Sequence, residues 1–256
     1  MSRRQFGSGE PVVIMHGLLG SGRNWQAVGK ALAREFDVYL VDLRNHGDSP
    51  WADEMSYPAM AADILRMLDD LGLERASLVG HSMGGKAAMC TALAAPERIA
   101  RLAVVDIAPV AYDHGHGFRF YLETMLSLDL ASMSRRADIE SGLAESIEDA
   151  PIRAFLAQNS APGDSGLFWK SNLRVLLESL PTITGWPEPP ENSSFAGPTL
   201  FLRGGQSPYV EDSATQGIRE LFPALELETV DGAGHWVHAE APKATLEALH
   251  RLLAES

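Results

Sequence analysis

Short apolar runs recur along the whole chain, and their spacing is the strongest constraint on the fold. The six clearest are PVVIMHG, DVYLVDL, ASLVGH, RLAVVDIAP, PTLFLRGG and LELETV. Most are rich in Val, Leu and Ile without polar alternation, which is typical of strands covered on both faces. Residues 57–71 and 242–253, between such runs, show helical spacing of apolar side chains. Strands that alternate with helices predict an α/β protein with a mostly parallel, doubly wound sheet.

One connection is too long for an ordinary crossover. About 90 residues separate Asp106 from Pro198, whereas a complete strand–helix–strand unit needs roughly 30. The surplus contains apolar stretches with helical character at residues 118–128, 152–158 and 168–180, together with Pro and Gly breaks. We therefore expect a helical cap (lid), residues 112–186, inserted in a core domain of residues 1–111 and 187–256. We expect the cap to lie over the carboxyl edge of the sheet, where open α/β sheets bind ligands.

The composition narrows the range of partners. The 256 residues include 34 acidic and 21 basic side chains, a formal net charge of −13, which disfavours nucleic acid and membrane as partners. Cys90 is the single cysteine, so no intramolecular disulfide or cysteine zinc site is available. Asp113, His114 and His116 resemble a metal-ligand cluster, but we expect them to be solvated, and we expect neither metal nor cofactor. The first apolar run is too short for a leader or a membrane span, so a cytoplasmic setting is expected.

A serine among glycines follows one of the predicted buried strands. In SLVGHSMGGKAAM, a run of β-formers leads to Gly80, Ser82 and Gly84, and a helix-like pattern follows. Gly-x-Ser-x-Gly between a strand and a helix is the pattern of a nucleophile elbow, a tight turn that exposes the serine hydroxyl above the sheet. A glycine-flanked serine that only caps the helix would have the same five residues. The strand and the helix around the motif favour Ser82 as a nucleophile.

A serine nucleophile needs a base, and two histidines compete for that role. His235 and His238 lie in DGAGHWVHAEAP, between the last predicted strand and the last predicted helix. In this architecture the histidine comes last in the chain order Ser, acid, His. His238 lies nearer the helix expected at Pro242, whereas His235 lies in the glycine-flanked loop. His235 is therefore the favoured base.

The acid is less obvious from the sequence. In many such enzymes it follows the penultimate strand, but that loop reads RGGQSPYV, with Ser207 at the expected position. Asp106 ends the run LAVVD, at the carboxyl end of an earlier strand. Its burial there would be costly without a partner, which an imidazolium would supply. Asp106 is the favoured acid, and the alternatives are Asp212, Glu211 or a missing acid.

Acyl transfer also needs hydrogen-bond donors for the oxyanion. The backbone N–H of Met83, directly after the serine, is one expected donor. The other is the N–H of Leu18 in HGLLGSGRNW, which can point inward because Gly17 keeps the turn close. We also expect substrate contacts from residues around the serine and from aromatic side chains of the cap, namely Gly17, His81, Phe118, Tyr121, Trp169 and Trp236.

Three charged residues near these motifs have structural interpretations. Lys86 lies on the helix after Ser82, and we expect it to be solvated or salt-bridged. Asp42 and Arg44, in VDLRNHGDSP, are expected to hold their loop by hydrogen bonds.

Together, these motifs resemble those of the α/β-hydrolase-fold serine esterases and, more narrowly, the bacterial YbfF-type acyl esterases. The supporting segments span nearly the whole chain: HGLLGSGRNW, VDLRNHGDSP, YPAMAADI, GHSMGGKAAM, VVDIAPV, GGQSPYV and GAGHWVHAEAP. The resemblance implies Ser82 as nucleophile, His235 as base and Asp106 as acid. It implies small acyl esters as substrates, with acyl-coenzyme A thioesters as a further class. The leading antiparallel strands of the fold are expected to be reduced to one hairpin at residues 5–13.

We therefore expect a serine carboxylic-ester hydrolase that works through a Ser-His-Asp triad and an acyl-enzyme, as a monomer or weak homodimer. A C–C bond hydrolase or a lyase on the same scaffold is one alternative. A ligand receptor that keeps these residues without turnover is another. Haloalkane dehalogenases and epoxide hydrolases are disfavoured, because they use Asp where this chain has Ser82.

Overall fold

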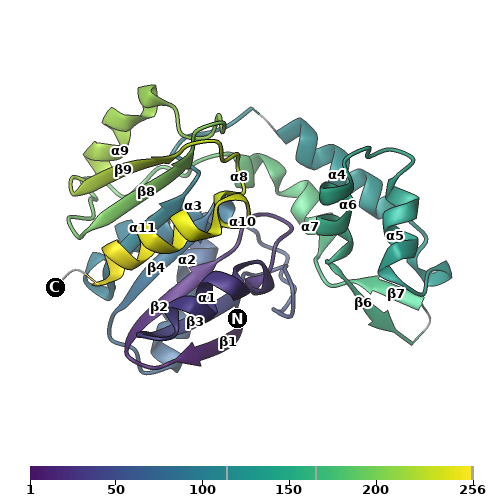
Figure 1. Cartoon of the computed structure of the whole chain (residues 1–256), viewed down its shortest axis with the longest axis horizontal. Coiled ribbons are helices and arrows are strands. Elements are labelled where there is room, and N and C mark those ends of the chain that lie inside the picture. The colour runs from purple at the N-terminus through teal and green to yellow at the C-terminus, as the bar shows by residue number, and fades with distance from the viewer. Residues whose placement is uncertain (114, 165, 255–256) are drawn as a thin grey trace.

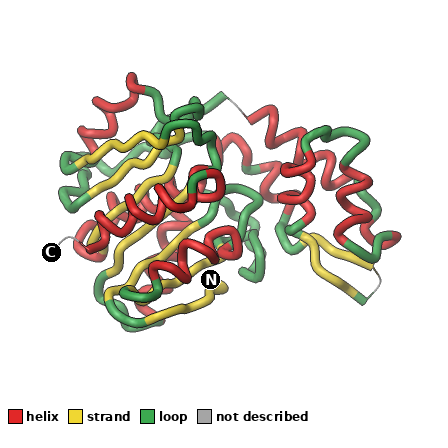
Figure 2. The backbone as a smooth tube through the Cα atoms, in the orientation of Figure 1, coloured by secondary structure: helices red, strands yellow, loops and turns green. Residues whose placement is uncertain are grey.

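The computed structural model describes residues 1–113, 115–164 and 166–254, without the side chains of residues 115 and 116. Within these residues a seven-stranded sheet has the strand order β1-β3-β2-β4-β5-β8-β9 (Figure 2). Its strands are β1 (Ser2–Gly7), β2 (Glu10–Met15), β3 (Phe36–Asp42), β4 (Ala76–His81), β5 (Ile99–Val105), β8 (Thr199–Gly204) and β9 (Leu225–Val230). All neighbours are parallel except β1 and β3. Each of the six apolar runs is one of these strands, which confirms the mostly parallel α/β sheet.

The first strand departs from the prediction. β1 does not form a hairpin with β2, because β3 lies between them and pairs with β1 in antiparallel register, Ser2 opposite Asp42. Gly7 and Gly9, with φ of 81° and 122°, carry the chain tightly across the start of β3. A Cβ at Gly7 would lie 2.3 Å from the carbonyl oxygen of Phe36. The two glycines therefore let the chain cross over β3 and re-enter on its far side, and the predicted hairpin at residues 5–13 is wrong.

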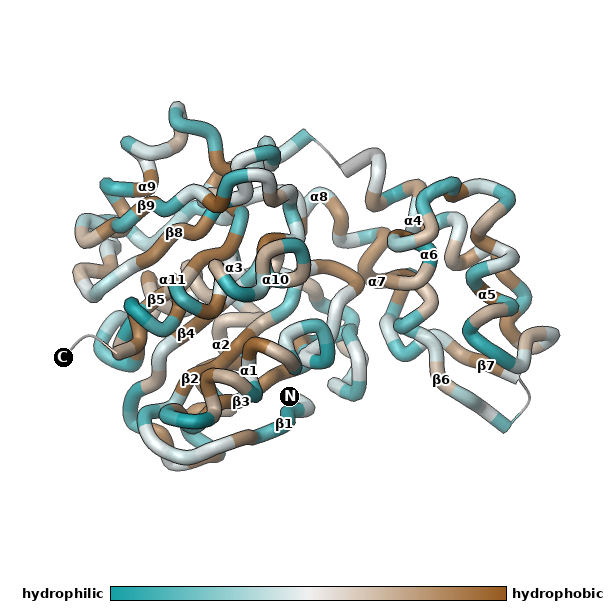
Figure 3. The backbone as a smooth tube through the Cα atoms, in the orientation of Figure 1, coloured by the Kyte–Doolittle hydropathy of each residue, from teal (hydrophilic) through white to brown (hydrophobic). Residues whose placement is uncertain are grey.

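Helices cover both faces of the sheet (Figure 1). One face carries α1 (Gln26–Leu32), α10 (Val237–Glu240) and α11 (Pro242–Ala254), and the other carries α2 (Tyr57–Asp70), α3 (Met83–Ala94) and α9 (Thr215–Leu221). The short turns of 3-10 helix are η1 (Gly22–Trp25), η2 (Pro96–Arg98), η3 (Leu130–Ser132) and η4 (Asp212–Ala214). Along β2, Val12 and Ile14 pack with the first group, whereas Val13 and Met15 pack with the second. Because both faces are buried at the centre of the sheet, the strands there are mostly hydrophobic, as the brown segments in Figure 3 show. The edge strands β1 and β9 carry polar side chains that are partly exposed.

The long connection between β5 and β8 lies beside the carboxyl edge of the sheet (Figure 1). It contains α4 (Gly115–Ser127), α5 (Arg136–Leu143), α6 (Ala150–Ala157), α7 (Leu173–Glu178), α8 (Leu180–Thr184), and the antiparallel pair β6 (Ser160–Gly163) and β7 (Gly166–Trp169). Leu122, Met125 and Leu156 from this segment join the same apolar cluster as α2 and α3. We propose residues 112–186 as the limits of this cap.

One of the helices expected in the cap is wrong at its start. The stretch 168–180 begins inside β7, where Phe168 pairs with Ala161 of β6, and only α7 and the start of α8 are helical. The strand pair takes precedence because Gly166, with φ of 89°, makes a tight return that leaves Leu167 buried and Phe168 exposed. The helix then begins after Asn172, whose side chain accepts a hydrogen bond from the Val175 N–H at its N-terminus.

The loop after β3 is held by charged side chains, as predicted. Asp42 accepts hydrogen bonds from the N–H groups of Gly22 and Asp48, both at 2.8 Å. The Arg44 guanidinium forms an ion pair with Asp63 at 2.7 Å. These bonds join the loop to η1 and to α2.

Two sequence expectations concern metal binding and membranes. His114 and the side chain of His116 lie outside the described residues. In the part of the chain that the structure does describe, no group of three His, Cys, Asp or Glu side chains could hold a metal ion. None of its helices combines the length and the apolar character needed to span a bilayer.

We predict that Gly84→Ala lowers the free energy of unfolding by about 3 kcal/mol through overpacking. A Cβ at this position, in the first turn of α3, would lie 2.6 Å from the His16 carbonyl oxygen and 2.7 Å from that of Met15. Gly217 on α9 is the matched control, because a Cβ there meets nothing within 4 Å and Gly→Ala in a helix gains about 0.5–1 kcal/mol. Urea denaturation measures both variants, and equal midpoints would contradict the prediction.

Candidate active site

Ser82 occupies the turn between β4 and α3. Its φ of 52° and ψ of −120° are a strained conformation for a residue with a side chain. The turn is tight enough that a Cβ at Gly80 would lie 2.2 Å from the carbonyl oxygen of Gly84. The Ser82 side chain makes no capping hydrogen bond to α3. The geometry is that of the predicted nucleophile elbow, and the alternative of a helix-capping serine is not supported.

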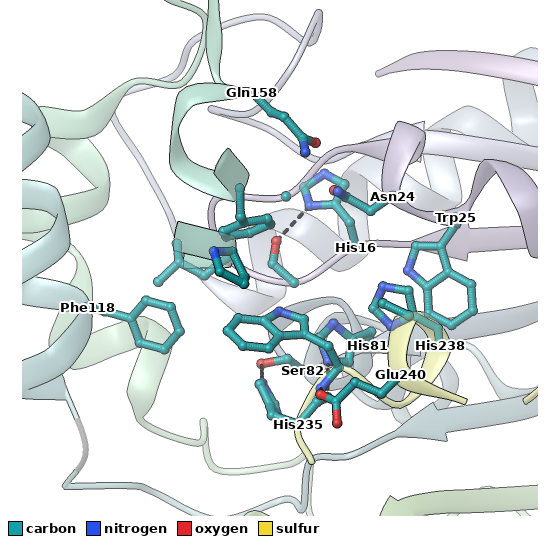
Figure 4. A pocket seen from close by; sticks show the side chains of 17 residues that line it. His16, Asn24, Trp25, His81, Ser82, Phe118, Gln158, His235, His238 and Glu240 are labelled. Atoms are coloured by element: carbon teal, nitrogen blue, oxygen red, sulfur yellow. Dashed lines mark hydrogen bonds between the residues drawn. The ribbon is translucent and has the colours of Figure 1, made fainter. Parts of the chain in front are cut away.

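Three residues that are far apart in the sequence meet above this turn. His235, in the loop between β9 and α10, has its Nε2 atom 3.1 Å from Ser82 Oγ (Figure 4). Its Nδ1 atom is 2.7 Å from Oδ2 of Asp106, which follows β5 and is 0% exposed. An ionised carboxylate only accepts hydrogen bonds, so Nδ1 carries the proton and Nε2 offers its lone pair to the serine hydroxyl. The arrangement can remove the serine proton without large motion.

Asp106 is held by donors from the loop after β8. Its Oδ1 accepts a hydrogen bond from the Gly204 N–H at 2.9 Å, and its Oδ2 accepts one from the Ser207 hydroxyl. Ser207 stands at the position after the penultimate strand where an acid was expected, and here it donates to a carboxylate that follows another strand. Asp212 forms an ion pair with Arg203 and its side chain is 88% exposed. The alternative acid is therefore directed away from the histidine.

His235 is also fixed by residues that the sequence analysis did not select. Glu240 on α10 accepts hydrogen bonds from the N–H of Gly234 at 2.6 Å and of Trp236 at 3.2 Å. The ring of Tyr209 stacks on the imidazole, with centroids 4.1 Å apart. Glu240 lies in the predicted motif HAEAP, so its position five residues after the base is the signal that could have identified it. The carboxylate bridges the backbone on both sides of His235 and limits the positions that the ring can take.

The neighbouring histidines are buried and play different parts. His238 stacks on Trp25 with ring centroids 4.3 Å apart, and burial lowers its pKa to about 4. Burial likewise lowers the pKa of His16 to about 4 and that of His81 well below 6.5. His81 Nε2 donates to the His235 carbonyl oxygen at 2.9 Å. At neutral pH these three rings are uncharged. Of the histidine rings that the structure describes, that of His235 is the one hydrogen-bonded to the serine hydroxyl, which favours it over His238.

The two expected oxyanion donors lie next to Ser82. Met83 is the first residue of α3, so its N–H lacks a partner within the helix. Gly17 brings the other loop close, because a Cβ added to it would lie 3.3 Å from Ser82 Cβ. Leu18, Ser82 and Met83 line a small cavity of about 30 Å³, a volume that suits one water-sized group.

Two larger cavities border His235, and the first of them is also lined by Ser82. The first, of about 350 Å³, lies between the core and the cap and includes Gly17, His81, Phe118 and Trp236 (Figure 4). The second, of about 230 Å³, is lined mainly by apolar side chains: Phe118, Tyr121, Ile152, Phe155, Leu156, Tyr209 and Trp236. Five of the six expected substrate contacts therefore line these cavities.

Trp169 is the expected contact that the structure places elsewhere. Its indole donates a hydrogen bond to the carbonyl oxygen of Met125, at the inner side of the cap, and among the described residues it lines neither large cavity. The sequence analysis missed Asn24, Trp25, Phe155 and Gln158, which line the first cavity. Asn24 and Trp25 belong to the motif HGLLGSGRNW, whereas Phe155 and Gln158 come from the cap, where no motif marked them.

Comparisons with known proteins place this geometry in a family. A family model described as the alpha/beta hydrolase fold matches residues 10–242. The chain belongs to the α/β-hydrolase fold family. This α/β hydrolase is 39% identical over 250 residues to the sn-1-specific diacylglycerol lipase ABHD11 of Mus musculus, which covers 95% of this chain and 80% of that protein.

Two further relatives agree with this assignment. The esterase YbfF of Escherichia coli (strain K12) is 36% identical to this α/β hydrolase over 246 residues, 95% of this chain and 92% of that protein. The solved structure of a marine microorganism esterase superposes with a TM-score of 0.94 at 36% identity and covers 98% of each chain. The resemblance stated from the motifs is confirmed, and this α/β hydrolase is an enzyme of the esterase type.

We predict that this α/β hydrolase loses stability as the pH falls from 7 to 5. His16 and His238 have pKa values of about 4 in the folded state, against about 6.5 when unfolded. The unfolded chain therefore binds more protons over this interval. Each of the two histidines lowers the free energy of unfolding by about 2 kcal/mol as the pH falls from 7 to 5. Urea denaturation at both pH values measures the loss. His238→Phe, which retains a ring to stack on Trp25, should reduce the difference, and an unchanged difference would contradict the assignment.

Proposed function

We propose that the protein hydrolyses small carboxylic esters through a Ser-His-Asp triad and an acyl-enzyme intermediate. The observation that carries the proposal is the chain of contacts from Ser82 Oγ to His235 at 3.1 Å and from His235 to Asp106 at 2.7 Å. A hydroxyl, a neutral imidazole and a buried carboxylate in this order are the components that activate a serine at neutral pH.

The first half-reaction transfers the acyl group to the enzyme. His235 Nε2 takes the proton of Ser82 as Oγ attacks the ester carbonyl carbon, and the carbonyl oxygen becomes an oxyanion. Asp106 stabilises the imidazolium through Nδ1, and Ser207 and Gly204 keep that carboxylate in place. The intermediate then collapses, and the C–O bond to the alcohol breaks. The leaving alcohol receives the proton from His235, and the acyl group remains on Ser82.

The second half-reaction regenerates the enzyme. His235 takes a proton from a water molecule, whose oxygen attacks the acyl carbon, and a second oxyanion forms. The bond from the acyl carbon to Ser82 Oγ breaks, Ser82 recovers its proton from the imidazolium, and the carboxylic acid leaves. In both steps the backbone N–H groups of Leu18 and Met83 hold the oxyanion, and each such donor contributes about 3 kcal/mol of transition-state stabilisation. Side chains, backbone N–H groups and water supply every group that these two half-reactions use.

The cavities suggest the size and polarity of the substrate. The space of about 230 Å³ beside His235 has mainly aromatic and aliphatic walls, which suits a short or medium acyl chain. The larger space of about 350 Å³ also offers polar side chains such as Asn24 and Gln158. A substrate with an apolar portion and a more polar portion would use both.

Turnover of p-nitrophenyl esters tests the proposal. We expect repeated turnovers with p-nitrophenyl butyrate, no turnover by Ser82→Ala, and a decrease of about 10⁴-fold in kcat for Asp106→Asn, the size seen when a triad carboxylate is replaced. Asp212→Asn is the matched control and should leave kcat unchanged, because Asp212 faces solvent. A single stoichiometric burst without turnover would indicate a ligand receptor, and loss of activity only in Asp212→Asn would overturn the choice of acid.

Acyl-coenzyme A thioesters are a second candidate substrate class. A cavity of about 150 Å³ beside the active-site cavity is lined by Arg23, Arg136 and Lys170, and the two cavities share Asn24 and Gln158. Arginine side chains bind phosphate oxygens well, and the coenzyme A leaving group carries phosphates. Lys170 forms an ion pair with Asp48 at 2.6 Å, so the two arginines are the main candidates for phosphate contacts.

A pair of thioesters with the same acyl group tests whether the phosphates of coenzyme A are recognised. Octanoyl-coenzyme A carries phosphates, whereas the octanoyl thioester of N-acetylcysteamine does not. We expect the double variant Arg23→Ala, Arg136→Ala to raise KM about tenfold for the first and to leave the second unchanged, which is the effect of losing about 1.4 kcal/mol of binding. Arg174→Ala on α7 is the control. Equal changes for both substrates would contradict a phosphate subsite.

A further inference from the structure

Lys86 is a buried cation one helical turn after Ser82. Its side chain is almost fully enclosed, with the residue 1% exposed. The expectation of a solvated or salt-bridged lysine is wrong, because the ammonium donates to three carbonyl oxygens, those of Val110 at 2.8 Å, Thr184 at 2.9 Å and Gly185 at 2.5 Å. Three N–H donors therefore meet three backbone acceptors.

Those acceptors lie on both connections between the core and the cap. Val110 belongs to the segment that leaves β5 and leads to α4, whereas Thr184 and Gly185 end α8 and lead back to β8. The connections also bond to each other, through the N–H of Tyr112 and the carbonyl oxygen of Thr184 at 3.0 Å. Lys86 thus contacts both connecting segments, the one that leads from the core to the cap and the one that returns to the core.

Two aromatic rings face the ammonium in addition to the three carbonyl oxygens. Its Nζ atom lies 4.7 Å from the ring centroid of Tyr112 and 5.7 Å from that of Tyr57, distances at which a ring face attracts a cation. Tyr57 also donates a hydrogen bond to the carbonyl oxygen of Ile183 at 2.5 Å, next to the same connection. Burial lowers the pKa of Lys86 to about 7, so the carbonyl oxygens and ring faces compensate for only part of the lost hydration.

We propose that Lys86 is a positioning residue that fixes the cap over the active-site cavities by holding both connections against the helix that begins after Ser82. The cap brings Phe118 and Tyr121 on α4 to the acyl-chain cavity. A shift at the connections would move these walls while leaving the bond between His235 and Ser82 intact. Lys86 therefore sets how well an extended acyl chain is enclosed. This consequence for catalysis rests on the ester hydrolysis proposed above.

Ester chain length provides the kinetic test. We expect Lys86→Met to raise KM for p-nitrophenyl octanoate about tenfold, with less than a twofold change in kcat and KM for p-nitrophenyl acetate, after correction for active-site concentration. Lys86→Gln, which retains two donors, should lie between Lys86→Met and the unchanged protein. Lys243→Met is the matched control, because this lysine is on the surface of α11, with its side chain 89% exposed. A loss of kcat that is equal for both esters, or no change for either, would overturn the proposal.

Hydrogen exchange of the unchanged protein tests the same idea without any variant and without activity. The amide of Tyr112 bonds to Thr184, and that of Gly185 bonds to Pro181 at 3.0 Å, so both should exchange slowly although they lie in irregular segments. Fast exchange at these two amides would overturn the role of Lys86, even if Lys86→Met does not fold. Slow exchange in a protein that hydrolyses no ester would support the fixed cap and refute the proposed function alone.

Discussion

The buried carboxylate of Asp106 is the interaction on which the site depends. It has no contact with solvent, so its charge is tolerable only because three donors from different parts of the chain converge on it. They are the His235 imidazole, the Gly204 amide and the Ser207 hydroxyl. The same bonds fix the ring of His235, and through it the direction of the lone pair that faces Ser82. The need to satisfy one buried charge thus connects β5, the loop after β8 and the loop after β9.

A second buried charge, the ammonium of Lys86, connects the core to the cap. Lys86 and Asp106 both lie just beyond the carboxyl ends of neighbouring strands, and each is satisfied by groups distant in sequence. In the proposed mechanism the carboxylate orients the histidine base, whereas the ammonium contacts the connections to the cap. Between them lies the strained turn at Ser82, which is supported by Gly80 and Gly84. The cap supplies most of the apolar walls of the cavity of about 230 Å³.

Much of the fold could be predicted because each strand carries its own signal. Six apolar runs, most of them without alternation, matched six strands of the sheet, and the glycines around Ser82 matched the predicted elbow. The pairing of β1 with β3, in place of the expected hairpin at residues 5–13, was not predictable from local pattern, because strand order depends on which neighbour a strand pairs with. The pair β6 and β7 was also missed, since a four-residue strand such as Gly166–Trp169 has too few residues to distinguish its period from that of a helix.

By itself the sequence determined the α/β class, and it predicted the position of the proposed nucleophile and the order in which the proposed serine, acid and histidine follow one another. These properties depend on residue types within a few positions of each other, which local sterics and periodicity can decide. Only the tertiary structure decided that Ser207 supports Asp106, that Glu240 holds the loop of His235 and that Lys86 has carbonyl partners. Ser207 and Asp106 are 101 residues apart, and Lys86 and Gly185 are 99 apart. Whether a buried charge has a partner is decided when such segments pack together.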